Sequence, residues 1–165
     1  MIKNKEKLKP FLVLPKKGSE MADLVYTKKH PNHFLYGLGY IVSDNCKNYF
    51  SDIAFTKLNL LHWLFFPLEK WLIRETKTGF KIDQALLLYP RILNCDVIIA
   101  VGDSAALPIA FLKWLGVIKK PVIYITIGIS GKMKKLATNT KIVSFYSQIL
   151  SRIEKIICFS TIEKR

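Results

Sequence analysis

The stretch Val97–Pro108, VIIAVGDSAALP, joins a short apolar run to a glycine-acid-serine turn and the start of a helical pattern. Val97–Val101 is apolar throughout, which is typical of a parallel strand covered by helices on both faces. Gly102 permits the tight bend that follows, and Asp103 or Ser104 could cap the helix. This stretch predicts a parallel strand whose carboxyl end leads directly into a helix.

Short apolar runs and longer helical patterns alternate along the rest of the chain, which indicates a Rossmann-like α/β fold, a parallel sheet flanked by helices. No internal repeat or low-complexity linker marks a second domain, so residues 1–165 are expected to form one domain. An interior proline removes a hydrogen bond, so we expect Pro67 to kink or split the second helix and Pro90 to disturb the third. The expected strands are Phe11–Leu14, Tyr49–Phe55, Val97–Val101, Val122–Thr126 and Lys155–Phe159. The expected helices are Phe34–Val42, Leu58–Arg74, Ile82–Leu93, Ser104–Leu115 and Thr140–Ile153.

The composition fits a globular domain with a sizeable core, since 50% of the 165 residues are hydrophobic. The formal net charge is +14, from 26 Lys and Arg against 12 Asp and Glu. This charge predicts an anionic partner: a phosphorylated ligand, an acidic membrane surface or nucleic acid. We expect no nucleic acid, because the lysines are scattered and no RNP, KH or C2H2 pattern is present.

The three cysteines, Cys46, Cys95 and Cys158, have no CxxC or CxxH spacing, so the sequence predicts no metal site and no disulfide framework. Reduced thiols indicate a cytoplasmic setting. The amino-terminal segment has too few apolar residues for a signal peptide. Charged residues, a glycine and a proline interrupt the most apolar window, Asp96–Ile118, so a transmembrane helix fits it poorly.

The glycine turn has two interpretations. A helix that starts at the carboxyl end of a parallel strand directs free backbone N–H groups toward the crevice where such sheets bind ligands. The same turn is also ordinary capping chemistry, and neither GxGxxG nor GxxxxGK[ST] is present. The roles of Asp103 and Ser104 therefore stay open between ligand binding and capping.

Two longer stretches carry a family pattern: CDVIIAVGDSAALPIAFLKWLGVIKKPVIYITIGIS, residues 95–130, and IEKIICFSTIEKR, residues 153–165. Both resemble the amino-terminal domain of GT-B glycosyltransferases of the family 4 type. The resemblance implies a Rossmann-like half of a two-domain enzyme, which binds the acceptor while a carboxy-terminal half holds the nucleotide-sugar. The positions that match the family pattern are Asp96, Gly102, Lys119, Lys120, Pro121, Tyr124, Gly128, Ile156, Ile157, Ser160 and Lys164.

The activity implied by this resemblance is transfer of a sugar from a nucleotide-sugar to a lipid-linked or polysaccharide acceptor. The family's carboxy-terminal donor domain is absent from the sequence, so a separate donor domain is an implied partner, and the chain alone is expected to be inactive and to hold no cofactor. Family members commonly carry histidines where this chain has Val101 and Ile127, so no catalytic residue is assigned. The alternative is a non-catalytic membrane-docking or acceptor-binding subunit, or a degenerate fragment.

The candidate acceptor and phosphate ligands lie in turns. The loop after the first strand offers two lysines that could meet a phosphate and a glycine that could bring backbone close to it, although solvated lysines are an equal alternative. A histidine before the first helix could act as a base near neutral pH or be an ordinary loop residue. The candidates are Lys16, Lys17, Gly18, His33, Gly102, Asp103, Ser104 and Gly128.

The helical pattern LNLLHWLFFPLEKWLIR, residues 58–74, carries one apolar stripe that is expected to pack against the core. Its aromatic residues outside the stripe, beside basic residues, also suit an interfacial helix on an anionic membrane, at the inner face. His62 is expected at the surface or half-buried. The stripe comprises Leu58, Leu61, Phe65, Leu68 and Leu72, widened by Leu64 and Trp71. The candidate membrane contacts are Trp63, Phe66, Lys70, Arg74, Lys132, Lys134 and Lys135.

Overall fold

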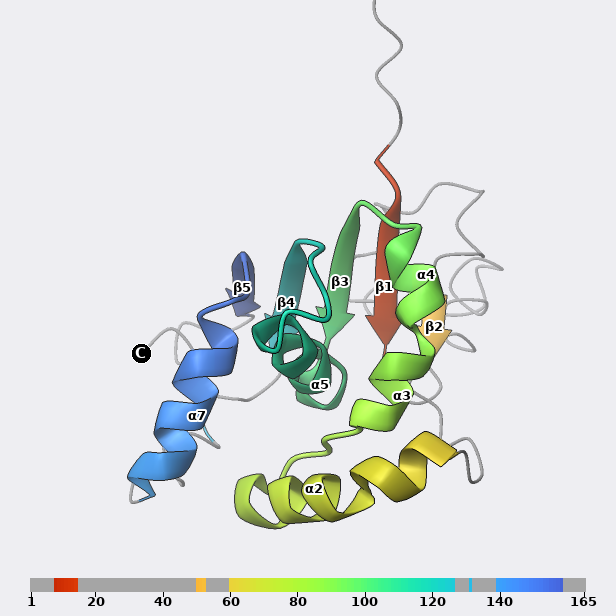
Figure 1. The fold of residues 1–165 in the computed structure, drawn as a ribbon. Coiled ribbons are helices and arrows are strands. Elements are labelled where there is room, and N and C mark those ends of the chain that lie inside the picture. The colour runs from red at the N-terminus through yellow and green to blue at the C-terminus, as the bar shows by residue number, and fades with distance from the viewer. Residues whose placement is uncertain (1–7, 15–49, 53–59, 127–130, 132–138, 159–165) are drawn as a thin grey trace, which may run out of the picture.

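The computed structural model describes residues 8–14, 50–52, 60–126, 131 and 139–158, which form a Rossmann-like α/β fold (Figure 1). The strands are β1 (Pro10–Leu14), β2 (Phe50–Asp52), β3 (Val97–Val101), β4 (Val122–Thr126) and β5 (Lys155–Cys158). The helices are α2 (Leu60–Thr76), α3 (Ile82–Leu87), α4 (Tyr89–Leu93), α5 (Asp103–Trp114) and α7 (Thr140–Leu150). All five strands pair in parallel, in the order β2-β1-β3-β4-β5.

The three central strands confirm the prediction from their apolar runs. Every residue of β1 and β3 is buried, and β4 is buried except at half-buried Ile123. The bounds of β3 and β4 match the expected strands, and β1 begins one residue early because Pro10 pairs with Val97. Of the expected strand Tyr49–Phe55, residues 50–52 are described and form β2.

The helices lie in the expected segments, although α7 ends at Leu150 rather than Ile153 and α2 ends at Thr76 rather than Arg74. The expected helix Ile82–Leu93 is divided at Leu88 into α3 and α4, and Pro90 lies in the first turn of α4, where a missing N–H costs nothing. Pro67, by contrast, does not split α2, which is continuous around it. The carbonyl left without its N–H partner belongs to exposed Trp63, where water can bond to it. The expected helix Phe34–Val42 lies outside the described residues.

The core lies between the sheet and the helices. Three aromatic rings in the core, one from the segment before α3, one from α5 and one from α7, pack against one another. Phe80 precedes α3, and its ring centroid lies 5.8 Å from that of Phe111 on α5, in an edge-on arrangement. Phe145 of α7 lies 6.0 Å from Phe111 and 6.3 Å from Phe80 between centroids. These contacts fix α5 and α7 side by side on one face of the sheet (Figure 1).

The end of α2 holds a residue with left-handed backbone. Lys77 has φ of +52°, and its N–H donates to the Ile73 carbonyl over 2.9 Å, a helix ending that normally favours glycine. Because the left-handed conformation costs an L-residue ~1 kcal/mol, we expect Lys77→Gly to raise the free energy of unfolding by about that amount in urea denaturation. The control Lys70→Gly, in the interior of α2, should lower it by ~1 kcal/mol. Loss of stability in both variants would contradict this backbone assignment.

Candidate functional site

The strand order predicts a ligand crevice at the carboxyl ends of β1 and β3. From β1 the chain goes to β2 on one side of the sheet and later to β3 on the other, so the strand order reverses between them. Open parallel sheets bind ligands outside the carboxyl ends of the strands at such a point. The turn after β3 borders this crevice, and α2 crosses the same edge of the sheet (Figure 1). Lys16, Lys17, Gly18 and His33 lie outside the described residues.

Gly102 forms the turn after β3. It has φ of +77° and ψ of 155°, a conformation that L-residues rarely adopt, and it is the N-cap residue of α5. Its N–H donates to the Ile125 carbonyl over 2.8 Å, which ties the turn to β4. Asp103 or Ser104 was expected to cap the helix, but the N-cap residue is Gly102, which has no side chain.

The Asp103 side chain accepts a hydrogen bond inside the protein. Its side chain is nearly buried, with the residue 7% exposed, and its Oδ1 accepts a hydrogen bond of 2.6 Å from the Tyr124 hydroxyl. Burial and the nearby Asp103 carboxylate raise the pKa of Tyr124, so the hydroxyl stays protonated and donates. This contact explains why Asp103 does not cap α5 and places its carboxylate beneath the crevice.

A second tyrosine extends this buried polar group. Tyr146 of α7 lies close to Thr76 and Thr78 at the end of α2. Burial raises the pKa of Tyr146, and Asp103 adds to that shift. Thr76 in turn donates from its hydroxyl to the Leu72 carbonyl over 2.7 Å. The polar side chains under the crevice therefore join α2, β4, α5 and α7 below the carboxyl edge of the sheet.

Ser104 is half-buried at the start of α5, next to the connection between α2 and α3. A Cβ added at Gly79 would lie 3.2 Å from the Ser104 Cβ, which is closer than most real contacts of this kind. The glycine therefore allows the connection to approach the turn after β3. The rim at this point consists of the backbone of Gly102 and Ser104 and of the Gly79 segment.

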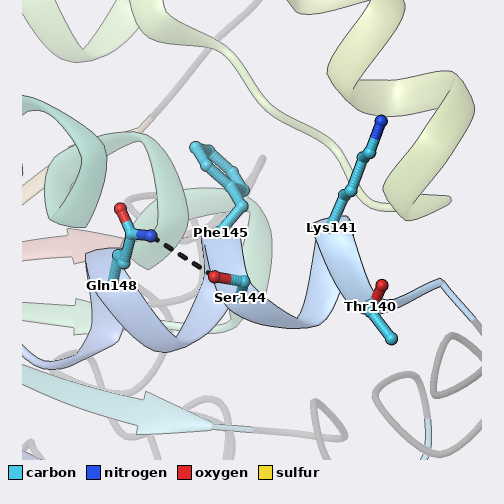
Figure 2. Close-up of a pocket in the computed structure, with 5 residues that line it drawn as sticks. All are labelled: Thr140, Lys141, Ser144, Phe145 and Gln148. Carbon is cyan, nitrogen blue, oxygen red and sulfur yellow. Dashed lines mark hydrogen bonds between the residues drawn. The ribbon is translucent and has the colours of Figure 1, made fainter.

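A hollow of about 490 Å³ lies along α7 and is open to solvent (Figure 2). Its lining combines an ammonium group, hydroxyls, an amide and an aromatic ring, and Figure 2 shows that Lys141, Phe145 and Gln148 point to the same side of the helix. Such a set suits a sugar, through hydroxyl and amide contacts, and a phosphate, through the lysine. None of the residues around this hollow was among the binding candidates expected from the sequence. Its residues are Thr140, Lys141, Ser144, Phe145 and Gln148.

The outer face of α2 is rich in exposed apolar residues. Trp63 is 68% exposed, Leu64 71% and Trp71 46%. The expectation that Leu64, Leu68 and Trp71 belong to the core stripe is therefore wrong, whereas Leu72 is buried and Phe65 packs against the core. The buried apolar stripe of α2 is narrower than expected, because a carboxylate side chain also points inward among the apolar residues.

Basic residues accompany this face. Lys70 Nζ lies 5.9 Å from the centre of the Phe66 ring, and Arg74 Nε pairs with Glu75 Oε1 at 3.1 Å on the exposed side. Gly128, Lys132, Lys134 and Lys135 lie outside the described residues. Among the helices of the described ranges, none has the length and apolar character needed to cross a membrane.

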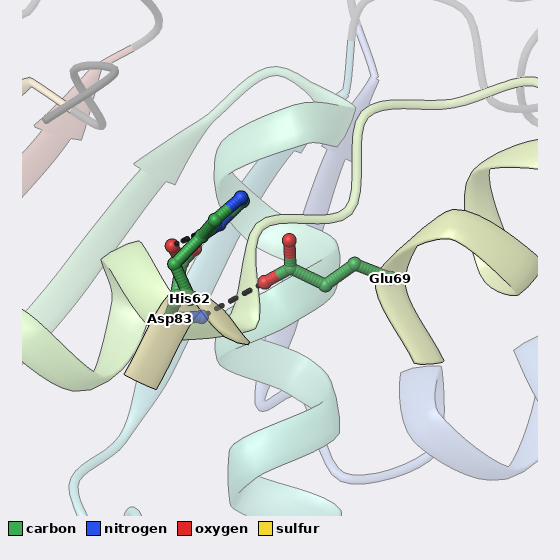
Figure 3. Close-up of side chains that lie close together, drawn as sticks. All are labelled: His62, Glu69 and Asp83. Atoms are coloured by element: carbon green, nitrogen blue, oxygen red, sulfur yellow. Dashed lines mark hydrogen bonds and ion pairs between the residues drawn. The ribbon is translucent and has the colours of Figure 1, made fainter. Parts of the chain in front are cut away.

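The inward carboxylate of α2 belongs to Glu69, which meets His62 and Asp83 (Figure 3). Glu69 Oε1 accepts the Asp83 N–H over 3.0 Å and so serves the start of α3, whose N-cap residue Lys81 makes no side-chain cap. Asp83 Oδ2 lies 3.0 Å from His62 Nδ1. His62 is half-buried, as expected, but this cluster was missed. The spacing of His62 and Glu69, two helical turns, was the available signal.

Comparisons of this chain with models of known protein families, with curated proteins and with solved structures find no match. The functional interpretation therefore depends on the fold, on the contacts at the carboxyl edge and on the resemblance of the two sequence stretches.

Proposed function

We propose that this chain forms the acceptor-side half of a GT-B glycosyltransferase, which transfers a sugar from a nucleotide-sugar to a lipid-linked or polysaccharide acceptor. The observation that carries the proposal is the reversal of the strand order between β1 and β3, with the Gly102 turn and the start of α5 at the carboxyl end of β3. The resemblance supports it, because the matching residues Asp96 and Gly102 flank β3 and Tyr124 lies on β4.

The crevice suits an acceptor that carries a phosphate. The first N–H groups of α5 and the positive end of its dipole lie at the rim and attract an anion. Lys141 and the polar groups of α7 offer contacts to a sugar or a second phosphate. The nucleotide-sugar is held by a second Rossmann-like domain in this proposal, and this half binds and orients the acceptor.

The same edge suits an anionic membrane surface. The exposed tryptophans and leucine of α2 provide apolar area for the headgroup layer, and Lys70 and Arg74 provide charge for anionic lipid. Because α2 crosses the edge where the crevice lies, docking through α2 brings the crevice close to lipid-linked acceptors (Figure 1). The location that follows is the inner, cytoplasmic face of the membrane.

A non-catalytic acceptor-binding or membrane-docking subunit is the second candidate, and one observation favours it. Val101, where the resembling family commonly has histidine, is fully buried and carries no titratable group. The end of β3 can then contribute no acid or base to the reaction. A transfer assay with a donor domain present distinguishes the two, since sugar transfer supports the enzyme and binding without transfer supports the subunit.

The affinity of the chain for acceptor lipid tests the proposal. We expect vesicles that contain a polyprenyl diphosphate sugar to bind the chain more tightly than identical vesicles without it. The paired change Lys141→Ala and Gln148→Ala should reduce that difference by ~10-fold or more, because each removes a charge-assisted or neutral hydrogen bond worth ~0.5–3 kcal/mol. Arg152→Ala, an exposed charge just after α7, is the matched control and should change nothing. Equal binding to both kinds of vesicle would show that the chain does not bind the acceptor lipid.

A further inference from the structure

We propose that His62, Glu69 and Asp83 form a site for one divalent transition-metal ion of the zinc class, independently of the function proposed above. One ligand atom from each of the three residues lies within 4.8 Å of the other two. Zinc accepts this combination of imidazole nitrogen and carboxylate oxygen, with bonds of ~2.0–2.2 Å that set ligand atoms ~3.5 Å apart. The 3.0 Å between His62 Nδ1 and Asp83 Oδ2 is close to that spacing, and a Glu69 carboxylate oxygen lies within 4.8 Å of a ligand atom of each.

One oxygen of each carboxylate accepts a backbone N–H, and the other contacts side chains with which the ion would compete. Asp83 Oδ2 contacts His62 and Gln84, and Glu69 Oε2 contacts Lys81. Asp83 Oδ1 accepts the Gln84 N–H over 2.7 Å, while Oδ2 faces His62. Glu69 Oε1 accepts the Asp83 N–H over 3.0 Å, while Oε2 lies 3.5 Å from Lys81 Nζ. Hydrogen bonds of this kind orient the ligands of protein metal sites.

The charge of the cluster also favours a cation. Glu69 and Asp83 are each 1% exposed, so two carboxylates share one buried volume. Burial raises the pKa of Glu69, and the Asp83 carboxylate adds to it. A divalent ion offsets both charges at once, whereas the Lys81 ammonium pairs with Glu69 at 3.5 Å. Lys81 is partly exposed and can turn to solvent when the ion binds, and partly exposed His62 gives the ion a route inward.

The consequence for the fold is a link between two helices. His62 and Glu69 belong to α2, and Asp83 belongs to the first turn of α3 (Figure 3). An ion held by all three fixes α2, with its exposed apolar face, to the helix that packs on the sheet. Zinc should therefore raise the melting temperature of the chain, because it binds the folded state preferentially.

Titration of the metal-free chain with Zn²⁺ in a calorimeter tests the site. We expect one saturable site, and His62→Gln and Asp83→Asn should each weaken its affinity by at least ~100-fold, since loss of even an outer-shell partner costs ~10–100-fold. Glu75→Gln, on the same helix outside the cluster, is the matched control and should bind as the wild type does. Circular dichroism checks that each variant is folded. No saturable binding, or equal binding by His62→Gln, overturns the proposal.

Cobalt provides a test that needs no variant. Co²⁺ in this site should shift the His62 ring protons paramagnetically in NMR spectra and give no thiolate-to-metal charge-transfer band. Such a band, or His62 signals that do not move, would assign the metal to the cysteines or to another histidine and overturn the proposal.

Discussion

Replacing Tyr124 by phenylalanine should lower the free energy of unfolding by ~2–3 kcal/mol at neutral pH. The change removes the hydroxyl that donates to Asp103 Oδ1 over 2.6 Å and leaves that carboxylate in place with the residue 7% exposed. A hydrogen bond to a charged group contributes ~1.5–3 kcal/mol. Urea denaturation followed by circular dichroism measures the loss.

A double-mutant cycle identifies the cause of that loss. In an Asp103→Ala background, Tyr124→Phe should cost much less, because the acceptor of its hydrogen bond is already gone. Tyr89→Phe makes the same chemical change on α4 and should alter stability by no more than ~0.5 kcal/mol. Equal losses for Tyr124→Phe with and without Asp103 would show that the hydrogen bond contributes no stability.

The combined change Trp63→Ser and Leu64→Ser should weaken binding to anionic vesicles by at least ~100-fold. Both side chains are well exposed, at 68% and 71%, so they are available to enter the headgroup layer. Burying a large apolar side chain contributes ~1.5–3 kcal/mol, and ~1.4 kcal/mol corresponds to a tenfold change in binding. Vesicle flotation measures the bound fraction as lipid concentration is raised.

Two further variants separate the apolar from the electrostatic contribution. Leu93→Ser, on α4 near the opposite edge of the sheet, removes an exposed leucine of the same kind and should leave binding unchanged (Figure 1). Lys70→Ala with Arg74→Ala should weaken binding to anionic vesicles and leave neutral vesicles unaffected, at ~1 kcal/mol per charge. If the variant Trp63→Ser with Leu64→Ser binds vesicles as the wild type does, α2 does not contact the membrane.

The sheet could be predicted from the sequence because its signals are local. Val97–Val101 is apolar throughout and Val122–Thr126 is apolar up to its last residue, as buried parallel strands are, and the glycine at the end of β3 marks the turn. The division of the expected helix Ile82–Leu93 at Leu88 was harder to predict. Pro90 interrupts the helical pattern, but it does not determine the residue at which α3 ends.

The side-chain contacts of the site could not be predicted, because they join residues far apart in the sequence. Asp103 and Tyr124 are 21 positions apart, and no local pattern pairs them. Glu69 lies among apolar residues of α2 and faces inward only because the start of α3 needs an acceptor there. That inward turn also explains why Leu64 and Trp71 are exposed when their spacing suggested the core.

NMR mapping tests whether the chain binds the acceptor at the Gly102 turn and in the α7 hollow. The ¹⁵N-labelled chain is titrated with a water-soluble, short-chain prenyl diphosphate sugar, so that binding needs no membrane. We expect saturable shifts at the amides of Gly102 and Ser104, at the rim of the crevice. We expect further saturable shifts along Thr140–Ser144, in the α7 hollow. The absence of saturable shifts, or shifts confined to β5 at the far edge of the sheet, would contradict it.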